Sequence, residues 1–80
     1  MADEARTEVA NLLAERVGSR RLTSAEVEAI LGLAGAAAHR AGDRTAAPLA
    51  SFLAGLGVRD RDDWADAVDE LRRVLEDGAL

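Results

Sequence analysis

Apolar residues recur at helical spacing along almost the whole chain, and the sequence has no alternating β-branched run typical of strands. Four such segments are separated by short stretches rich in glycine and polar residues. We therefore expect an all-α fold, a compact four-helix domain with short connections, in which residues 1–80 form a single helical domain. Short connections favour antiparallel neighbours.

The first half of the chain predicts two helices. The first covers about 3–17 and carries one apolar stripe. The second follows Thr23 and Glu26, whose three-residue spacing is typical of a capping box, and runs to about Arg40 before the terminator Gly42. Its middle is apolar on every side, which is typical of a buried central helix.

The second half predicts two more helices. The third covers about 46–56, with Thr45 as its cap and Gly57 as its end. The fourth begins near Asp60, where negative charge suits a helix N-terminus, and closes at Gly78.

The stripes also predict the packing. We expect the second and third helices to form the apolar centre and the amphipathic first and fourth helices to cover it. The predicted core residues are Ile30, Leu31, Ala34, Leu49, Phe52, Leu53, Val68 and Leu71.

Composition narrows the class of function. The chain has 80 residues and a net charge of −5, which argues against nucleic-acid binding because phosphate contacts need basic surfaces. It has no cysteine and one histidine, and no phosphate-binding or metalloprotease motif, so we predict no metal site and no cofactor. The acidic start and the lack of a long apolar run predict a cytoplasmic protein without a membrane segment.

A polar corner is expected where the second helix gives way to the third. His39, Arg40, Asp43 and Arg44 lie close together in the sequence there. They would serve either as helix caps and local ion pairs or as a small polar site for an anion or a partner's carboxylate. No nucleophile or second acid/base group accompanies His39, so we predict no catalytic residue.

Three further features each have two readings. Trp64 is the sole tryptophan and belongs either to the edge of the core or to an interface hot spot. Gly32 and Gly35 on the central helix indicate close approach of another helix, or a ligand lying on bare backbone. The acidic residues between 60 and 70 favour helix capping and a solvated face over a cation site, because the calcium-loop spacing is missing.

The stretch from Ile30 to Gly57 resembles a family of small actinobacterial helical domains of unknown function. The shared pattern is Leu-Ala…Ala-His, an Arg, then Ala-Pro-Leu…Phe-Leu…Gly, carried here by His39, Arg44, Pro48 and Phe52. Such domains occur alone or attached to molybdenum cofactor guanylyltransferase, the enzyme that joins a guanine nucleotide to molybdopterin. The resemblance implies a setting in that biosynthesis. Ala36 stands where the family pattern has an acidic residue.

We therefore expect a non-catalytic accessory or protein-interaction module, linked through the resemblance to molybdenum cofactor (molybdopterin-guanine dinucleotide) biosynthesis. Its candidate binding residues are His39, Arg40, Asp43, Arg44 and Trp64. The expected partner is a protein, with a cofactor-biosynthesis enzyme first among the candidates and a homodimer also open. The alternative is a small-ligand or anion-binding helical protein. An exposed apolar patch would favour the first reading, and a closed pocket with convergent polar groups the second.

Overall fold

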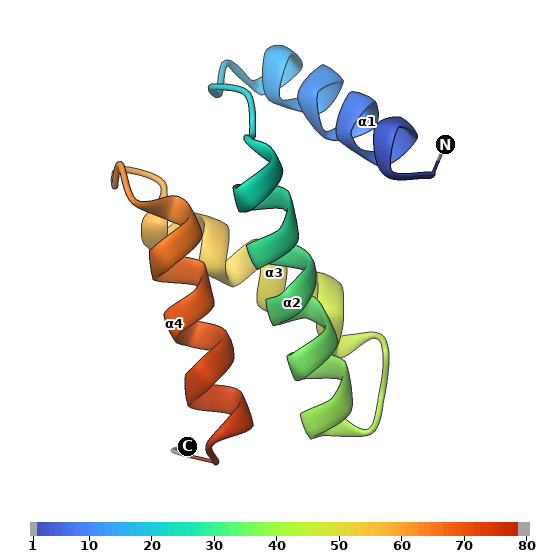
Figure 1. Ribbon diagram of the computed structural model, residues 1–80, viewed down its shortest axis with the longest axis vertical. Helices are drawn as coiled ribbons and strands as arrows, with labels where there is room; N and C mark the ends of the chain where they lie inside the picture. Colours follow the sequence, from blue (N-terminus) through green and yellow to red (C-terminus); the bar gives the residue numbers. More distant parts are fainter. Residues whose placement is uncertain (1, 79–80) are drawn as a thin grey trace.

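The computed structural model describes residues 2–78 and contains four helices. They are α1 (Ala2–Val17), α2 (Ser24–Ala41), α3 (Ala46–Val58) and α4 (Trp64–Glu76), and residues 2–78 include no strand (Figure 1). The radius of gyration is 12.5 Å, close to the value of about 12 Å expected for a globular chain of this length. The predicted all-α four-helix fold is confirmed.

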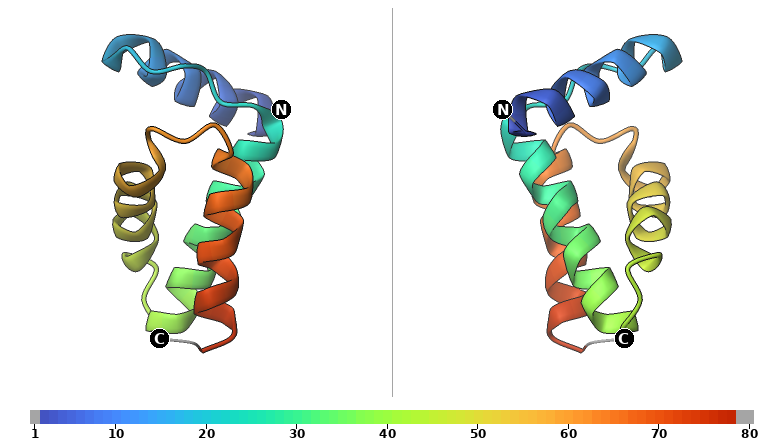
Figure 2. Two further views of the ribbon diagram at one scale, coloured as in Figure 1. Left: turned by 90° about the vertical axis from the view of Figure 1, so that its left-hand side faces the viewer. Right: turned by 90° about the vertical axis from the view of Figure 1, so that its right-hand side faces the viewer.

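Helices α2 and α4 lie side by side and run in the same direction (Figures 1 and 2). Helix α3, which connects them in the chain, runs in the opposite direction. Two contacts fix the shared direction of α2 and α4: Gly32 lies against Arg72, and further along both helices Arg40 Nη1 donates to the Leu75 carbonyl at 3.1 Å. The expectation of antiparallel neighbours across short connections is therefore right for α2 and α3 and for α3 and α4, and two such reversals make α2 and α4 parallel. Helix α3 leads the chain back from the C-terminal end of α2 to its N-terminal end, and α4 begins there.

The boundaries of α2 follow the predicted signals. The Thr23 hydroxyl accepts from the Glu26 amide at 3.2 Å, and the Glu26 carboxylate accepts from the Thr23 amide at 2.8 Å. This reciprocal pair is the capping box expected from the spacing. Gly42 adopts a left-handed conformation, with φ of 67°, and its amide donates back to the last turn.

The predicted signals for α3 and α4 are partly wrong. Thr45 makes no side-chain cap; instead its amide donates to the Asp43 carboxylate at 2.9 Å. Gly57 does not end α3, which continues to Val58. Helix α4 begins at Trp64 rather than near Asp60, because the acidic residues before it belong to the connecting turn.

The core lies where α2, α3 and α4 meet, around Leu33, Ala54 and Val68. Ile30 and Leu75 are half-buried and pack against this cluster. Most buried apolar residues have small side chains: Ala14, Val27, Leu33, Ala37, Ala54, Ala67 and Val68.

Most of the predicted core proves to be exposed. Val68 is buried, and Ile30 and Ala34 are half-buried. The remaining five lie 40% to 68% exposed: Leu31, Leu49, Phe52, Leu53 and Leu71. The predicted central position is right for α2, which packs against both α3 and α4, and wrong for α3, of which only one face packs on the rest of the chain.

Helix α3 turns its small residues inward. Ala50, Ser51 and Ala54 are buried or half-buried, whereas its large apolar stripe faces outward. We call this stripe the α3 face: Leu49, Phe52, Leu53 and Leu56, each at least 50% exposed. A helix with two apolar sides can pack on either one, and the small side allows α3 to approach α2 closely.

Helix α1 repeats this pattern and does not cover the centre. Ala14 is buried and Ala10 is half-buried, while the large residues point outward. We call these the α1 face: Val9, Leu12, Leu13 and Val17, each 57% to 78% exposed. Helix α1 crosses the N-terminal end of α2 and contacts the other helices sparsely (Figure 1).

The two glycines of α2 have different surroundings. A Cβ placed on Gly32 would lie 3.2 Å from Cδ of Arg72, so Gly32 allows α4 to approach. A Cβ on Gly35 would meet no atom within 4 Å. The close-approach reading therefore holds for Gly32 and does not explain Gly35.

We predict that Gly35→Ala raises the free energy of unfolding by about 0.5–1 kcal/mol, because alanine loses less backbone entropy in a helix and meets no neighbour here. Gly32→Ala is the matched control and should gain less, since its methyl group crowds the Arg72 side chain. Urea denaturation of both variants measures the difference. Equal gains from both would contradict the close approach.

Candidate functional site

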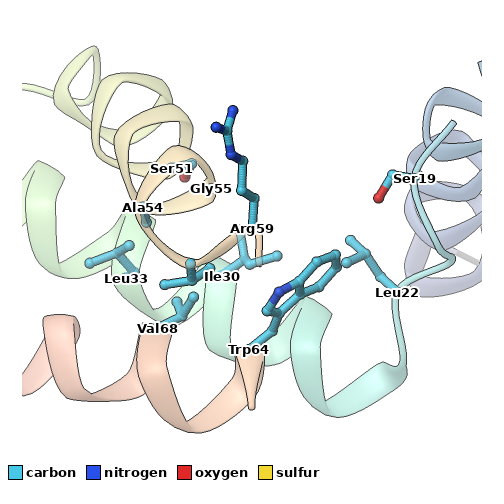
Figure 3. Close-up of a pocket in the computed structure, with 11 residues that line it drawn as sticks. Ser19, Leu22, Ile30, Leu33, Ser51, Ala54, Gly55, Arg59, Trp64 and Val68 are labelled. Atoms are coloured by element: carbon cyan, nitrogen blue, oxygen red, sulfur yellow. The ribbon is translucent and has the colours of Figure 1, made fainter. Parts of the chain in front are cut away.

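An open groove of about 260 Å³ lies between α2, α3, the start of α4 and the α1–α2 connection (Figure 3). We call it the Trp64 groove. Its lining is mostly apolar and consists of Ser19, Leu22, Ile30, Leu33, Ser51, Ala54, Gly55, Val58, Arg59, Trp64 and Val68. Because α3 presents alanine, serine and glycine to α2, the inner surfaces do not fill this end of the helix layer.

The indole of Trp64 carries the main polar feature of the groove. Its Nε1 atom is buried and has no hydrogen-bond partner among residues 2–78. Figure 3 shows the nitrogen edge of the ring turned toward Ile30 and Val68. An unpaired buried N–H costs about 1–3 kcal/mol. An occupant that offers an oxygen acceptor there would remove that cost.

Arg20 joins the groove to the start of α2. Its Cζ lies 3.5 Å from the centroid of the Trp64 ring, a cation–π contact. Its guanidinium also holds the Glu26 carboxylate in a bidentate pair, at 3.0 and 2.8 Å. Arg20 therefore ties the capping box of α2 to the first residue of α4.

Glu26 is a buried carboxylate, with only 6% of its surface exposed. The hydrogen bonds from Arg20 lower its pKa below the ordinary value, and those from Thr23 act in the same direction. Burial raises the pKa and is second in size to the Arg20 hydrogen bonds, so the net shift of the Glu26 pKa is downward. The charged form of Glu26 is therefore the one that the folded chain favours.

Arg59 lines the opposite rim of the groove from α2 and is exposed. Its nearest acidic contact is Asp60, with Nε 3.7 Å from the carboxylate. Such a long contact between side chains that are 70% and 92% exposed holds little energy. Arg59 can therefore turn toward an anionic group at the mouth of the groove.

The predicted polar corner lies at the other end of α2. His39 and Arg40 line a shallow hollow of about 420 Å³ together with Gly35, Ala36 and Glu76. His39, Arg40, Asp43 and Arg44 are all exposed. Arg40 donates to the last turn of α4, and Asp43 accepts from the Thr45 amide, which lowers the Asp43 pKa. Arg40 and Asp43 thus form hydrogen bonds at helix ends, Arg40 at the end of α4 and Asp43 at the start of α3.

The five predicted binding residues do not form one site. Trp64 starts α4, beside the first half of α2, whereas His39 lies beside Leu75 and Glu76 near the end of α4. Ala36 lines the hollow next to His39, so this position supplies no carboxylate to orient the imidazole. The role of the corner in binding stays a prediction.

Two aspartates of the second half, Asp63 and Asp69, are engaged in close local ion pairs. Arg61 holds Asp63 at 2.7 Å, and Asp69 accepts from both Arg72 and Arg73. These contacts lower the pKa of both aspartates. Within residues 2–78, no three acidic or histidine side chains are grouped so that they could hold a metal ion. No helix in that range is long and apolar enough to cross a bilayer.

Sequence reasoning missed Arg20 and the outward faces of α1 and α3. The loop position of Arg20 gave no signal for its contact with Trp64, because Trp64 lies far along the chain from it. The α3 face did have a signal: residues 46–58 contain no charged residue and offer alanines opposite the large stripe. A helix without a polar side is buried centrally or covered by a partner.

The fold defines a small all-α domain that carries the apolar Trp64 groove and two uncovered apolar helix faces. The chain belongs to the family described as Domain of unknown function (DUF6457), whose model matches residues 2–79. The match confirms the expectation of an uncharacterised domain family. No curated protein and no solved structure gives a significant match to the chain.

We predict that Glu26→Gln lowers the free energy of unfolding by about 1 kcal/mol at pH 7, because a neutral amide binds Arg20 more weakly than a carboxylate does. Because the folded pKa is lowered, wild-type Glu26 contributes stability above its ordinary pKa of 4.5 and loses it as the pH falls below that value.

The measurement is a set of urea melts of both proteins between pH 7 and pH 3. The difference between wild type and variant should shrink as the pH falls below the ordinary pKa of Glu26. A difference that stays constant over this range would contradict the charged state assigned to Glu26.

Proposed function

We propose that this domain is a non-catalytic protein-interaction module whose α1 and α3 faces are covered by protein. The observation that carries the proposal is the inverted packing of these two helices, which bury alanines and expose leucines. Exposed apolar surface on this scale is costly in water and marks interaction sites on small domains. An open groove and exposed polar corner do not resemble an enclosed catalytic centre.

The proposal includes a biosynthetic pathway in which the domain would act, that of the molybdenum cofactor. The resemblance to helical domains of actinobacteria that are attached to molybdenum cofactor guanylyltransferase makes that enzyme the first heterologous partner to test. The α3 face would supply the apolar anchor through Phe52. The corner around His39 and Arg44 would supply polar specificity, since both side chains are exposed.

We predict that Phe52→Glu weakens binding of a protein partner at least about tenfold, because it buries a charge against an apolar surface. The measurement is capture of host proteins on the immobilised domain, followed by titration calorimetry with the guanylyltransferase. Ala25→Glu is the matched control: it adds the same charge at an exposed position on α2. Equal capture by wild type and Phe52→Glu would contradict the proposal.

The same assay tests the polar corner. A His39→Ala, Arg44→Ala double variant should keep the wild-type melting temperature, because both residues are exposed and no helix cap uses either side chain. It should weaken partner binding if the corner is part of the interface. A destabilised double variant that still binds normally would assign the corner to capping alone.

A ligand-binding function is the second candidate, and the unpaired indole of Trp64 favours it. The ligand would have an apolar body for the groove, an oxygen acceptor for Nε1 and an anionic group for Arg59. A medium-chain carboxylate has this chemistry.

Titration with decanoate tests this candidate, because Trp64 is the only tryptophan and its fluorescence reports on the groove. We expect a saturable change that Arg59→Ala weakens severalfold, with decanol as the uncharged control ligand. A flat titration, or equal responses to decanoate in wild type and Arg59→Ala, would rule the candidate out.

A further inference from the structure

We infer that the protein which covers the α1 and α3 faces is a second copy of this chain, with α1 of each copy packed against α3 of the other. This inference rests on the proposed function and names its partner. It starts from the uncovered surface. The chain exposes 5785 Å², whereas a compact monomer of 8.4 kDa exposes about 4,600 Å².

The excess of about 1,200 Å² is what an interface of ordinary size requires. Stable protein–protein interfaces bury about 800 Å² on each partner, and obligate homodimers bury more. The exposed large apolar side chains show where the excess lies: among the residues whose side chains the structure describes, eight of the ten belong to the α1 and α3 faces.

The two faces suit each other in length and chemistry. The α1 face extends over about 12 Å from Val9 to Val17, and the α3 face over about 10 Å from Leu49 to Leu56. Each has four large apolar residues on one side of a helix. Helix α3 has no charged residue, so the charges that flank the α1 face meet no like charge on it.

The chain does not cover its own α3 face with α1. Arg6 Nη2 holds Glu28 on α2 at 3.0 Å, and Asn11 accepts from the Leu22 amide at 3.0 Å. These contacts hold α1 across the start of α2, and both faces stay exposed in that position. Neither face therefore has to be uncovered before a second copy docks on it.

Symmetry completes the argument. When α1 of the first copy covers α3 of the second, a two-fold axis places α1 of the second copy on α3 of the first. Both faces of both chains are then covered, and the assembly closes at two copies. The Trp64 groove is lined by the inner side of α3, through Ser51 and Ala54, so it is not part of this interface.

The first experiment measures the mass in solution by sedimentation equilibrium. We expect twice 8.4 kDa for the wild type, and a melting temperature that rises with protein concentration. Leu12→Glu on the α1 face and Phe52→Glu on the α3 face should each weaken the dimer at least about thirtyfold, the loss typical of an interface hot spot. The control Ala25→Glu should remain dimeric.

The second experiment identifies which helices pair. The chain contains no cysteine, so single cysteines can be placed at Leu13 and at Leu53 in separate proteins. Under mild oxidation, a mixture of Leu13→Cys and Leu53→Cys should form the mixed disulfide dimer in excess over either like pair. This test uses the full chain and does not depend on a variant that disrupts packing.

The outcomes separate this inference from the proposed function. A dimer that Phe52→Glu disrupts and Leu12→Glu does not, or one crosslinked only through Leu53, would overturn the α1–α3 pairing. A disulfide within one chain of the Leu13→Cys, Leu53→Cys double variant, without mixed dimers of the single variants, would overturn it too. A monomer at all concentrations that still captures another protein through Phe52 would overturn the dimer and leave the proposed function standing. A monomer that captures the same proteins with and without the Phe52→Glu substitution would overturn both the dimer and the proposed function.

Discussion

The size of the side chains that face α2 decides the rest of this structure. Helices α1 and α3 meet their neighbours through alanine and serine, and Gly32 of α2 leaves room for Arg72 of α4. Small contact residues let helix axes approach closely but bury little apolar area for each residue. The large residues of the same helices are consequently left outside. The uncovered faces follow from how the helices pack rather than from an unusual composition.

Arg20 compensates for part of this sparse packing at the top of the helix layer. It links the buried Glu26 carboxylate to the Trp64 ring and so joins the start of α2 to the start of α4. A buried carboxylate is stabilising only while it is paired, and here the pair also includes the capping box. The shape of the Trp64 groove therefore depends on Arg20, a residue of the connection between α1 and α2. Changes at Arg20 should affect the groove and the stability of α2 together.

The groove and the polar hollow of the domain lie at opposite ends of α2. The unpaired indole lines the groove, and His39 lines the hollow. No residue of the α1 or α3 face lines either of them. A dimer formed through those faces would leave two grooves and two polar corners accessible, which is an arrangement suited to holding a second protein at more than one point. The family assignment is compatible with this picture and does not specify it.

The sequence by itself determined the helices. The capping box at Thr23, the left-handed Gly42 and the absence of strand patterns are local signals, and local signals depend on neighbours within one or two turns. Thr45 does precede the first residue of α3, as predicted, but the side-chain hydrogen bond there comes from Asp43 and not from a Thr45 cap. The predicted start of α4 near Asp60 was wrong because Arg61 and Asp63 pair in the turn before the helix. Only the tertiary structure decided which side of α3 packs inward. Periodicity selects the largest residues as core, but Leu49, Phe52 and Leu53 are too large for the close approach that α2 makes to Ala50 and Ala54. The separation of His39 from Trp64 is also a matter of tertiary structure: α2 and α4 run parallel, so the end of α2 and the start of α4 lie at opposite ends of the pair, far beyond the reach of any local pattern.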